Sequence, residues 1–291
     1  MSSSKRIAII GSTGQLGTDL VVAAQSSGAE VVPITHGEMD VTDFSAVSRV
    51  ISSSAFDFVI NCAAFHRVDD CQDDPDSAFG VNTVGAYNVA RAAVATGAMP
   101  IFLSSDYVFD GEKQSPYVEA DQPRPLNVYG VSKAAGEAAV FIAGDAIVAR
   151  VSSLFGRAGS SGKGKNFIEN ILDKARSTGE AKVVDDIIMS PSYTRDVAAA
   201  IVHLIEVGAV GTFHLANAGE CSWYEFARAA VELTGIDARI EATKSDSYPT
   251  VTKRPSYSAL KSERAGSVGV VQRPWLDALT AYLVEKGHIS A

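Results

Sequence analysis

The sequence predicts an α/β protein in which a doubly wound parallel sheet is joined to a smaller C-terminal lobe. In the first half of the 291 residues, short β-branched segments alternate with longer segments whose apolar residues recur at helical spacing. The short segments are almost continuously apolar, which is typical of parallel strands covered by helices on both faces. A glycine-rich stretch follows the first of them, where such sheets turn sharply into their first helix.

Six short segments predict the strands of the main sheet, and the last of them lies far along the chain. They are residues 6–10, 30–34, 56–61, 100–104, 146–150 and 211–215. The helices between the first five strands are predicted at residues 15–25, 44–51, 75–94 (as one long helix or two) and 127–141. Asp43 is placed to cap the second helix, and successive crossovers are expected to be right-handed.

The pattern changes after Ser152, which indicates a second structural part. We expect a loop rich in Gly, Ser and Lys at 156–165 and a polar, irregular stretch at 242–267. Helices are predicted at residues 167–177, 195–207, 223–233 (opened by a capping box of Ser222 and Glu225) and 274–285. The predicted main domain is 1–150, with 188–218 returning to it, and the predicted smaller lobe is 151–187 with 219–291.

Composition excludes several classes of partner. The chain carries a formal net charge of −9 at pH 7 without a basic patch, so neither nucleic acid nor an anionic membrane is an expected partner. The first apolar run, residues 7–10, is too short for a signal sequence or a membrane span. Cys62, Cys71 and Cys221 lack metal-ligand spacing, so neither a metal site nor a disulfide framework is predicted, and a reducing cytoplasmic setting is expected.

Residues 11–17, Gly-Ser-Thr-Gly-Gln-Leu-Gly, connect the first predicted strand to the first predicted helix. Glycine lets the backbone turn sharply and approach a pyrophosphate, whose charge is attracted by the free N–H groups of the helix N-terminus. A tight turn without a ligand is the alternative. The position after the first strand favours dinucleotide binding on a Rossmann-like domain. The loop residues predicted to contact the dinucleotide are Gly11, Thr13, Gly14, Gln15, Leu16 and Gly17.

The end of the second predicted strand bears on the choice of cofactor. An acidic side chain there favours NAD by bonding the adenosine 2′-hydroxyl, but residues 31–36 contain none. No Arg lies nearby to attract a 2′-phosphate. The sequence therefore favours NADPH weakly, with NADH as the alternative. Asp40 and Val41 follow and are predicted to border the adenine, although Asp40 would serve equally well as a turn or cap residue.

A tyrosine, a lysine and a serine are predicted to form a catalytic group. Tyr129 and Lys133 are four residues apart in a predicted helix, so they share a face. A lysine cation lowers the pKa of a nearby phenol, which suits proton exchange with a carbonyl or alcohol oxygen. Ser105 lies at the end of the fourth predicted strand, where open α/β sheets bind their ligands. A surface tyrosine beside a solvated lysine is the alternative for the pair alone.

Together these features resemble the extended short-chain dehydrogenase/reductase superfamily and, more closely, the dTDP-4-dehydrorhamnose reductase family. The resemblance covers nearly the whole chain and implies a Rossmann-like NAD(P)-binding domain with a smaller substrate-binding lobe. The motifs that carry it are Gly-Gln-Leu-Gly at 14–17, Asn-Cys-Ala-Ala-Phe at 61–65, Ser-Ser-Asp-Tyr-Val-Phe-Asp-Gly at 104–111, Pro-Leu-Asn-Val-Tyr-Gly at 125–130, Ser-Pro-Ser-Tyr at 190–193, Phe-His-Leu-Ala at 213–216 and Lys-Arg-Pro at 253–255.

The family implies hydride transfer from a reduced nicotinamide to the C4 ketone of a nucleotide-linked 6-deoxy-4-ketohexose, most directly dTDP-4-dehydrorhamnose to dTDP-L-rhamnose. Tyr129 would protonate the nascent alkoxide, Lys133 would hold the nicotinamide ribose, and Ser105 would hydrogen-bond the carbonyl oxygen. The implied cofactor-lining residues are Cys62, Ala63 and Ala64. The implied substrate-side residues, besides Ser105, are Asp106, Val108, Ser153, Asn166, Phe167 and Arg254, the last with a surface ion pair as its alternative.

Several positions depart from related patterns. Tyr107 follows Asp106 where related dehydratases carry Glu, which disfavours elimination and favours simple reduction. Ser153 stands where the family commonly has a Trp that packs on the sugar, so the identity of the sugar stays open. Residues 186–189 replace the family's Asp-Gln-x-Gly, and Gln72 replaces a common Glu.

Two further functions stay open. A non-catalytic dinucleotide-binding subunit is one, although such a subunit does not need the proton chemistry of Tyr129 and Lys133. A reductase or epimerase acting on another nucleotide sugar is the other. The Gly-Lys-Gly-Lys loop at 162–165 could meet a diphosphate or be a solvated loop, and a homodimer is a candidate quaternary state.

Overall fold

The computed structural model describes residues 4–159, 165–248 and 252–290. Its centre is a six-stranded parallel sheet in the order β10-β5-β4-β3-β1-β2. The chain runs from β1 outward to β2 on one side and to β3 on the other, so the order reverses beside β1, as in doubly wound sheets. The strands are β1 (Arg6–Ile10), β2 (Glu30–Ile34), β3 (Phe58–Asn61), β4 (Met99–Ser105), β5 (Ile147–Val151) and β10 (Gly211–His214).

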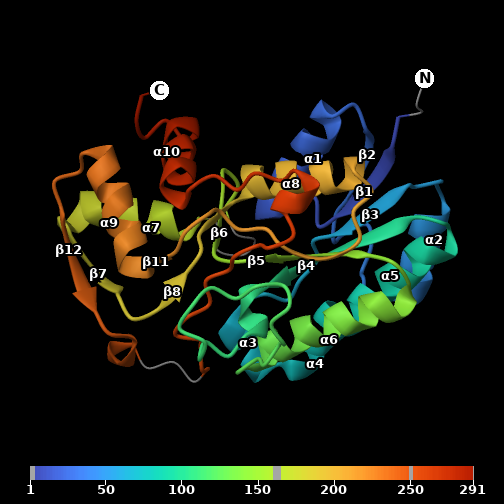
Figure 1. Cartoon of the computed structure of the whole chain (residues 1–291), viewed down its shortest axis with the longest axis horizontal. Helices are drawn as coiled ribbons and strands as arrows, with labels where there is room; N and C mark the ends of the chain where they lie inside the picture. The colour runs from blue at the N-terminus through green and yellow to red at the C-terminus, as the bar shows by residue number, and fades with distance from the viewer. Residues whose placement is uncertain (1–3, 160–164, 249–251, 291) are drawn as a thin grey trace.

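Helices cover both faces of this sheet (Figure 1). The α1 and α8 helices pack together on one face, and α2, α5 and α6 cover the other. Alternate residues of β1 serve the two faces, since Ile7 and Ile9 pack with α1 and α8 while Ala8 and Ile10 pack with α2 and α5. The helices are α1 (Gln15–Ser26), α2 (Phe44–Ser52), α5 (Ala86–Ala95), α6 (Val128–Ala143) and α8 (Thr194–Glu206). The predicted fold class is therefore confirmed.

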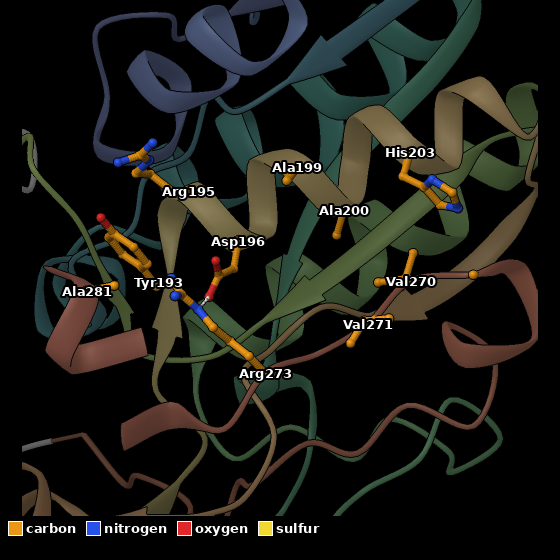
Figure 2. Close-up of a pocket in the computed structure, with 11 residues that line it drawn as sticks. Tyr193, Arg195, Asp196, Ala199, Ala200, His203, Val270, Val271, Arg273 and Ala281 are labelled. Atoms are coloured by element: carbon orange, nitrogen blue, oxygen red, sulfur yellow. Dashed lines mark hydrogen bonds and ion pairs between the residues drawn. The ribbon is translucent and has the colours of Figure 1, made fainter. Parts of the chain in front are cut away.

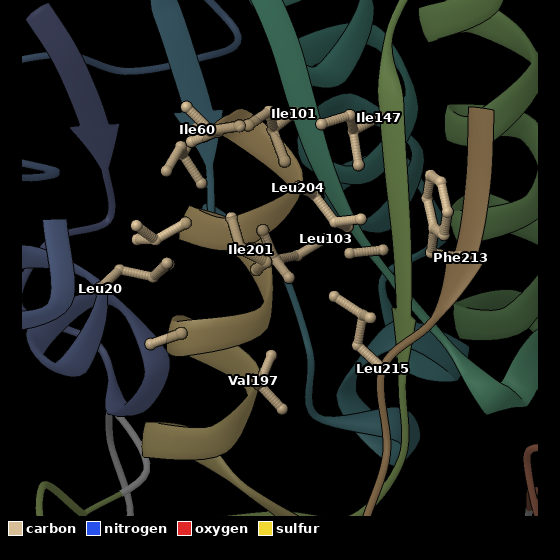
Figure 3. Packing of buried hydrophobic residues seen from close by; sticks show 14 of the residues in the cluster. Leu20, Ile60, Ile101, Leu103, Ile147, Val197, Ile201, Leu204, Phe213 and Leu215 are labelled. Atoms are coloured by element: carbon tan, nitrogen blue, oxygen red, sulfur yellow. The ribbon is translucent and has the colours of Figure 1, made fainter. Parts of the chain in front are cut away.

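The core between α8 and the sheet is built from branched aliphatic side chains. Figure 3 shows Val197, Ile201 and Leu204 of α8 directed at Ile101 and Leu103 of β4. Each fully buried aliphatic side chain stabilises the fold by about 1.5–3 kcal/mol relative to exposure. This packing fixes the strands in place, and so it also fixes the points at which the loops at their carboxyl ends begin.

The stretch predicted as one long helix or two, residues 75–94, is a helix interrupted by a wider turn. It consists of α4 (Pro75–Phe79), a π-helical segment η1 (Gly80–Gly85) and α5, and a short helix α3 (Val68–Asp73) precedes it. The π-helical turn directs the fully buried Asn82 toward α6, where its Nδ2 donates to Ser132 Oγ at 3.0 Å. Single π turns inside helices are frequent at functional sites.

The smaller lobe lies at the left of Figure 1 and contains the remaining predicted helices. They are α7 (Phe167–Thr178), α9 (Trp223–Thr234) and α10 (Trp275–Glu285). The capping box of Ser222 and Glu225 is confirmed at the start of α9. An aromatic core of Phe155, Tyr193, Phe226 and Tyr282 holds these helices together.

The lobe also contains strands that the sequence did not predict. β7 (Glu180–Val184) pairs in parallel with β12 (Arg239–Thr243), which corrects the irregular chain expected at 242–243. Two very short pairs, β6 (Leu154–Phe155) with β9 (Ser192–Tyr193) and β8 (Ile188–Met189) with β11 (Cys221–Ser222), lie between the lobe and the main sheet. Each of these segments is too short or too polar to stand out by hydrophobic pattern alone.

Candidate active site

The glycine loop and the end of β3 meet at the point where the strand order reverses. Gly11 has φ +73°, and a Cβ there would lie 3.2 Å from the backbone nitrogen of Ala63. A Cβ on Gly17 would lie only 2.2 Å from the carbonyl oxygen of Gly11. Both positions therefore require glycine, and the close approach brings the predicted loop residues beside the predicted segment 62–64.

Three buried polar atoms at this point have no hydrogen-bond partner among the described residues. They are Ser12 Oγ, Gln15 Oε1 and Asn61 Nδ2. Buried polar atoms are costly when unpaired, so such a group indicates a surface built for a polar ligand. A dinucleotide fits these donors and acceptors together with the glycine cradle. The sequence analysis named Gln15 but missed Ser12 and Asn61, because the glycine spacing does not indicate which other side chains face the ligand.

The start of α1 provides backbone donors for a phosphate. Gly14 is its N-cap and supplies no side-chain cap, which leaves the first N–H groups of the helix free for an anion. Thr13 is exposed, whereas the Leu16 side chain is buried in the core against α8. Leu16 can therefore contact a pyrophosphate only through its backbone.

The tip of β2 holds an acidic side chain, which corrects the expectation that none lies there. Glu38 folds back so that its Oε2 accepts from the Thr35 backbone nitrogen and from Thr35 Oγ1, both at 2.7 Å. These hydrogen bonds lower the pKa of Glu38. The tip lies beside the glycine loop, because Gly11 donates its N–H to the Ile34 carbonyl at 2.9 Å. The acid was missed because it comes after the strand and returns through a turn.

Asp40 and Val41 follow this turn. Asp40 Oδ1 accepts from the Thr42 backbone nitrogen at 2.9 Å and from Thr42 Oγ1 at 2.8 Å, and these bonds lower its pKa. This is the turn role given as the alternative for Asp40. The Val41 side chain is buried in the core against Gly85, and contact of either residue with adenine stays a prediction.

The structure brings Ser105 and Tyr129 together. Ser105 ends β4, and its side chain lies close enough to the phenol of Tyr129, in the first turn of α6, to influence the pKa of that phenol. Asn127 caps that turn by accepting from the Gly130 nitrogen at 2.9 Å. A Cβ on Gly130 would lie 2.2 Å from the Tyr107 carbonyl oxygen, so glycine is needed for α6 to approach β4 this closely.

Burial governs the two titratable groups of the pair. It raises the pKa of Tyr129 above its ordinary value, and the neighbouring Ser105 side chain opposes this rise. Burial lowers the pKa of Lys133 to about 7, against the opposing charge of Glu137. The expected lowering of the Tyr129 pKa is therefore wrong for this structure, because burial, which disfavours the charged phenolate, is the largest influence on that pKa. A phenol that keeps its proton at neutral pH suits a proton donor.

Lys133 is held inside the sheet-facing side of α6. It is 2% exposed, and its Nζ lies 4.0 Å from the centroid of the Phe102 ring of β4. One turn further along α6, the buried Glu137 accepts from Arg150 Nη2 at 2.7 Å and from Ser104 Oγ at 2.5 Å. The sequence analysis missed this buried ion pair, although Glu137 follows Tyr129 and Lys133 at the same four-residue spacing.

Asp106 is buried directly beside Ser105. Its Oδ1 accepts from Ser105 Oγ at 3.0 Å, and its Oδ2 accepts from Ser152 and Ser258 at 2.8 and 2.6 Å. Burial raises the pKa of Asp106, and the three hydroxyl donors oppose the rise. Val108 follows in the same turn, but its side chain is fully buried in a hydrophobic cluster, so a contact with substrate is left to its backbone.

Arg254 approaches the site through Tyr107. Its Nη2 lies 3.0 Å from Asp69 Oδ2, which is the ion pair given as its alternative role, and its charge opposes the rise that burial causes in the pKa of Tyr107. The Tyr107 ring packs edge-on against Tyr129, with centroids 5.7 Å apart. Ser153 is half-buried and has φ +44°, a left-handed conformation that is strained for serine.

Asn166 and Phe167 are engaged within the small lobe. Asn166 caps α7 by accepting from the Glu169 nitrogen, and its Nδ2 donates to Gly156 O and to Tyr282 Oη. Phe167 packs edge-on against Trp223. Their contact with substrate stays a prediction, and most of the 162–165 loop lies outside the described residues.

A separate cavity of about 590 Å³ lies along the outer side of α8, where Figure 2 shows Arg273 paired with Asp196. It contains none of the predicted site residues. Within residues 4–159, 165–248 and 252–290, no group of His, Cys, Asp or Glu side chains could hold a metal ion. No helix in those ranges is long and apolar enough to cross a membrane.

Comparison with known proteins places this geometry in a family. The family model named RmlD substrate binding domain matches residues 5–287. The dTDP-4-dehydrorhamnose reductase of Mycolicibacterium smegmatis is 38% identical, over 95% of this chain and 84% of the relative. This chain belongs to the dTDP-4-dehydrorhamnose reductase family. The predicted resemblance is thereby confirmed, and so is the predicted class of oxidoreductase.

Two further members are similar over almost their full length. The spore coat polysaccharide biosynthesis protein SpsK of Bacillus subtilis is 36% identical, over 97% of this chain and 98% of its own. The crystal structure of the Bacillus anthracis dTDP-4-dehydrorhamnose reductase in complex with NADP superposes with a TM-score of 0.92 at 32% identity, covering 97% and 99% of the two chains. The Rossmann-like arrangement is therefore shared with a family member whose structure holds the dinucleotide.

Proposed function

We propose that the protein reduces the C4 ketone of a nucleotide-linked 6-deoxy-4-ketohexose with NADPH, and that dTDP-4-dehydrorhamnose is its substrate and dTDP-L-rhamnose its product. The main support is the position of Ser105, at the carboxyl end of β4, beside the Tyr129 phenol in the first turn of α6. It brings a proton donor and a polar partner together beside the glycine cradle, where a nicotinamide and a carbonyl would meet. The choice of dTDP-4-dehydrorhamnose as the substrate rests on the family to which the chain belongs.

Tyr129, Ser105 and Lys133 have separate roles in the proposed reaction. The reduced nicotinamide, when bound, supplies the hydride. Tyr129, whose pKa burial holds above its ordinary value, gives its phenolic proton to the alkoxide oxygen that forms at C4. Ser105 orients that oxygen by hydrogen bonding. Lys133, whose Nζ lies 4.0 Å from the centroid of the Phe102 ring, would hold the nicotinamide ribose and stabilise the phenolate that remains.

The residues around the glycine loop would hold the dinucleotide. Ser12, Gln15 and Asn61 have polar atoms that need partners, and the first turn of α1 would receive the pyrophosphate. NADPH is proposed because the Bacillus anthracis relative binds NADP. The Glu38 carboxylate at the tip of β2 makes NADH the alternative, since an acid at that position favours a free 2′-hydroxyl.

A panel of nucleotide-linked 4-ketosugars, each assayed with NADPH and with NADH, tests this function. We expect consumption of NADPH with the dTDP-linked 4-keto-6-deoxy sugar, and NMR of the product identifies its configuration. Preference for another sugar in the panel would instead reveal the effect of Ser153 at the family's Trp position. Cofactor binding without turnover on every sugar would refute the enzyme function and favour a dinucleotide-binding subunit.

We also propose a cytoplasmic homodimer that needs neither nucleic acid nor a membrane. The three cysteines are unpaired, and the net charge of −9 opposes binding to polyanions. Exposed apolar side chains on the neighbouring helices α5 and α6, namely Val94, Val131, Phe141 and Ile142, support self-association. Light scattering on the purified protein measures the mass directly, and a monomer at micromolar concentration would refute the dimer.

A further inference from the structure

A segment of the C-terminal part, residues 252–260, crosses the carboxyl edge of the main sheet; we call it the strap. Asn127, the cap of the helix that carries Tyr129, donates from its Nδ2 to the Lys253 carbonyl at 2.8 Å. Gly111 packs so closely beneath the strap that a Cβ there would lie 2.9 Å from the Ser256 nitrogen. The strap is therefore in direct contact with the elements that hold both proposed catalytic side chains, Tyr129 and Ser105.

The most buried of these contacts joins Ser258 to Asp106. Ser258 Oγ donates to Asp106 Oδ2 at 2.6 Å, and both residues are 3% exposed. Ser152, at the end of β5, donates to the same oxygen at 2.8 Å. A carboxylate that is buried this deeply needs such donors, and bonds from hydroxyl groups to a charged oxygen are stronger than neutral ones.

The remaining oxygen of Asp106 sets the direction of the Ser105 hydroxyl. Ser105 gives its single proton to Oδ1 at 3.0 Å and accepts the Tyr107 N–H at 3.2 Å. While Ser105 donates to Asp106, it therefore has no proton left to donate to Tyr129. Asp106 in this way decides which partner Ser105 can donate to.

We propose that Ser258 is a positioning residue that acts through Asp106 to orient the Ser105 hydroxyl, so that the strap contributes to the rate of reduction. As charge develops on the substrate oxygen, the Ser105 proton turns from Oδ1 to that oxygen. Asp106 stays satisfied during this turn because Ser152 and Ser258 remain on Oδ2. The inference rests on the proposed reductase function and adds a residue that does not touch the substrate.

Three variants test the proposal in the full-length protein. Ser258→Ala removes the hydroxyl, Ser258→Thr keeps it, and Ser256→Ala makes the same change on an exposed side chain of the strap. For Ser258→Ala we expect kcat to fall roughly tenfold, the value of one hydrogen bond to a charged group. The KM for the ketosugar and the Kd for NADPH should stay within about twofold, because no contact to either ligand is removed. Ser258→Thr and Ser256→Ala should keep nearly full kcat.

Ser152→Ala provides a second route if Ser258→Ala folds poorly. It removes the other donor to Oδ2 from the side of β5 and should produce the same fall in kcat at constant KM. Unchanged kcat in Ser258→Ala, failure of Ser258→Thr to restore it, or an equal loss in Ser256→Ala overturns the proposal. Absence of turnover in the wild type, which is assayed first, overturns the proposed function and this inference with it.

Discussion

The carboxyl edge of the main sheet and the interior of the small lobe use buried polar groups in opposite ways. At the edge, Ser12 Oγ and Asn61 Nδ2 have no partner among the described residues, and the buried Lys133 has its pKa lowered to about 7. In the lobe, Asn166 bonds to the Glu169 nitrogen, to Gly156 O and to Tyr282 Oη. Unused hydrogen-bonding capacity therefore marks the edge as the ligand side, whereas the polar atoms of Asn166 already have partners within the lobe.

The largest expected effect comes from a substitution in the glycine loop at the carboxyl edge of the main sheet. Gly17→Ala places a Cβ 2.2 Å from the Gly11 carbonyl oxygen, so the cradle must open. We expect NADPH binding, measured by fluorescence titration, to weaken by about a hundredfold or more, since backbone contacts to the pyrophosphate are lost. Gly266→Ala is the matched control, because a Cβ there meets nothing within 4 Å. Equal affinity in both variants would show that the cradle does not hold the dinucleotide.

A second variant separates activity from stability at the edge. Lys133→Met should lower kcat roughly a hundredfold, because the charge that supports Tyr129 is lost. The same change should raise the free energy of unfolding at pH 6 by roughly 2 kcal/mol, since a buried cation is removed.

The lowered pKa of Lys133 also predicts how the change in the free energy of unfolding depends on pH. The pKa of Lys133 falls from 10.5 to about 7 on folding, so between these values the unfolded chain binds the extra proton and stability rises with pH. The gain from Lys133→Met should therefore be largest below pH 7 and shrink toward pH 10.5. Urea unfolding at several pH values measures it, and a destabilised variant at pH 6 would contradict the burial argument.

A smaller effect is expected in the lobe. Asn166→Ala removes the cap of α7 and leaves Gly156 O and Tyr282 Oη without that donor, so the free energy of unfolding should fall by roughly 2 kcal/mol. The kcat/KM for the ketosugar should stay within about threefold of wild type if Asn166 is only a cap. A selective rise in KM without loss of stability would instead place Asn166 on the substrate.

The smallest expected effect concerns the turn beside the strap. Ser153→Gly relieves the left-handed conformation at φ +44° and should stabilise the protein by about 0.5–1 kcal/mol in thermal unfolding. Ser153→Trp restores the aromatic residue common in the family and should change the ranking of sugars in the ketosugar panel. If the ranking is unaltered, the side chain at this position does not contact the sugar.

The strands and helices of the main sheet can be predicted from the sequence, because each is indicated by the pattern of residues within its own short segment. The strands at 6–10 and 30–34 match the structure, and Tyr129 and Ser105 meet as the strand-end argument predicts. The features that were missed depend on chain segments far apart. Glu38 reaches the β2 tip only through a turn, and the Glu137 pairing with Arg150 depends on how α6 lies against β5.

The strands of the small lobe were also missed because their partners lie far away in the sequence. β7 and β12 are separated by more than fifty residues and pair in parallel, so neither has a local partner that would reveal it. A resemblance can transfer Asn166 and Phe167 as substrate residues, but only the packing distinguishes a cap from a contact. Asn166 and Phe167 are predicted to contact the sugar, so the identity of the sugar is the part of the function that the sequence predicts least well.

The most direct measurement of the central claim compares wild type with Tyr129→Phe in reduction of the dTDP-linked 4-keto-6-deoxy sugar by NADPH. The phenylalanine ring can keep the edge-on contact with Tyr107, so the Kd for NADPH should not change. We predict that kcat falls roughly a thousandfold, because the phenolic proton donor is lost. Turnover within about threefold of wild type would contradict the assignment of Tyr129 as proton donor and with it the proposed mechanism.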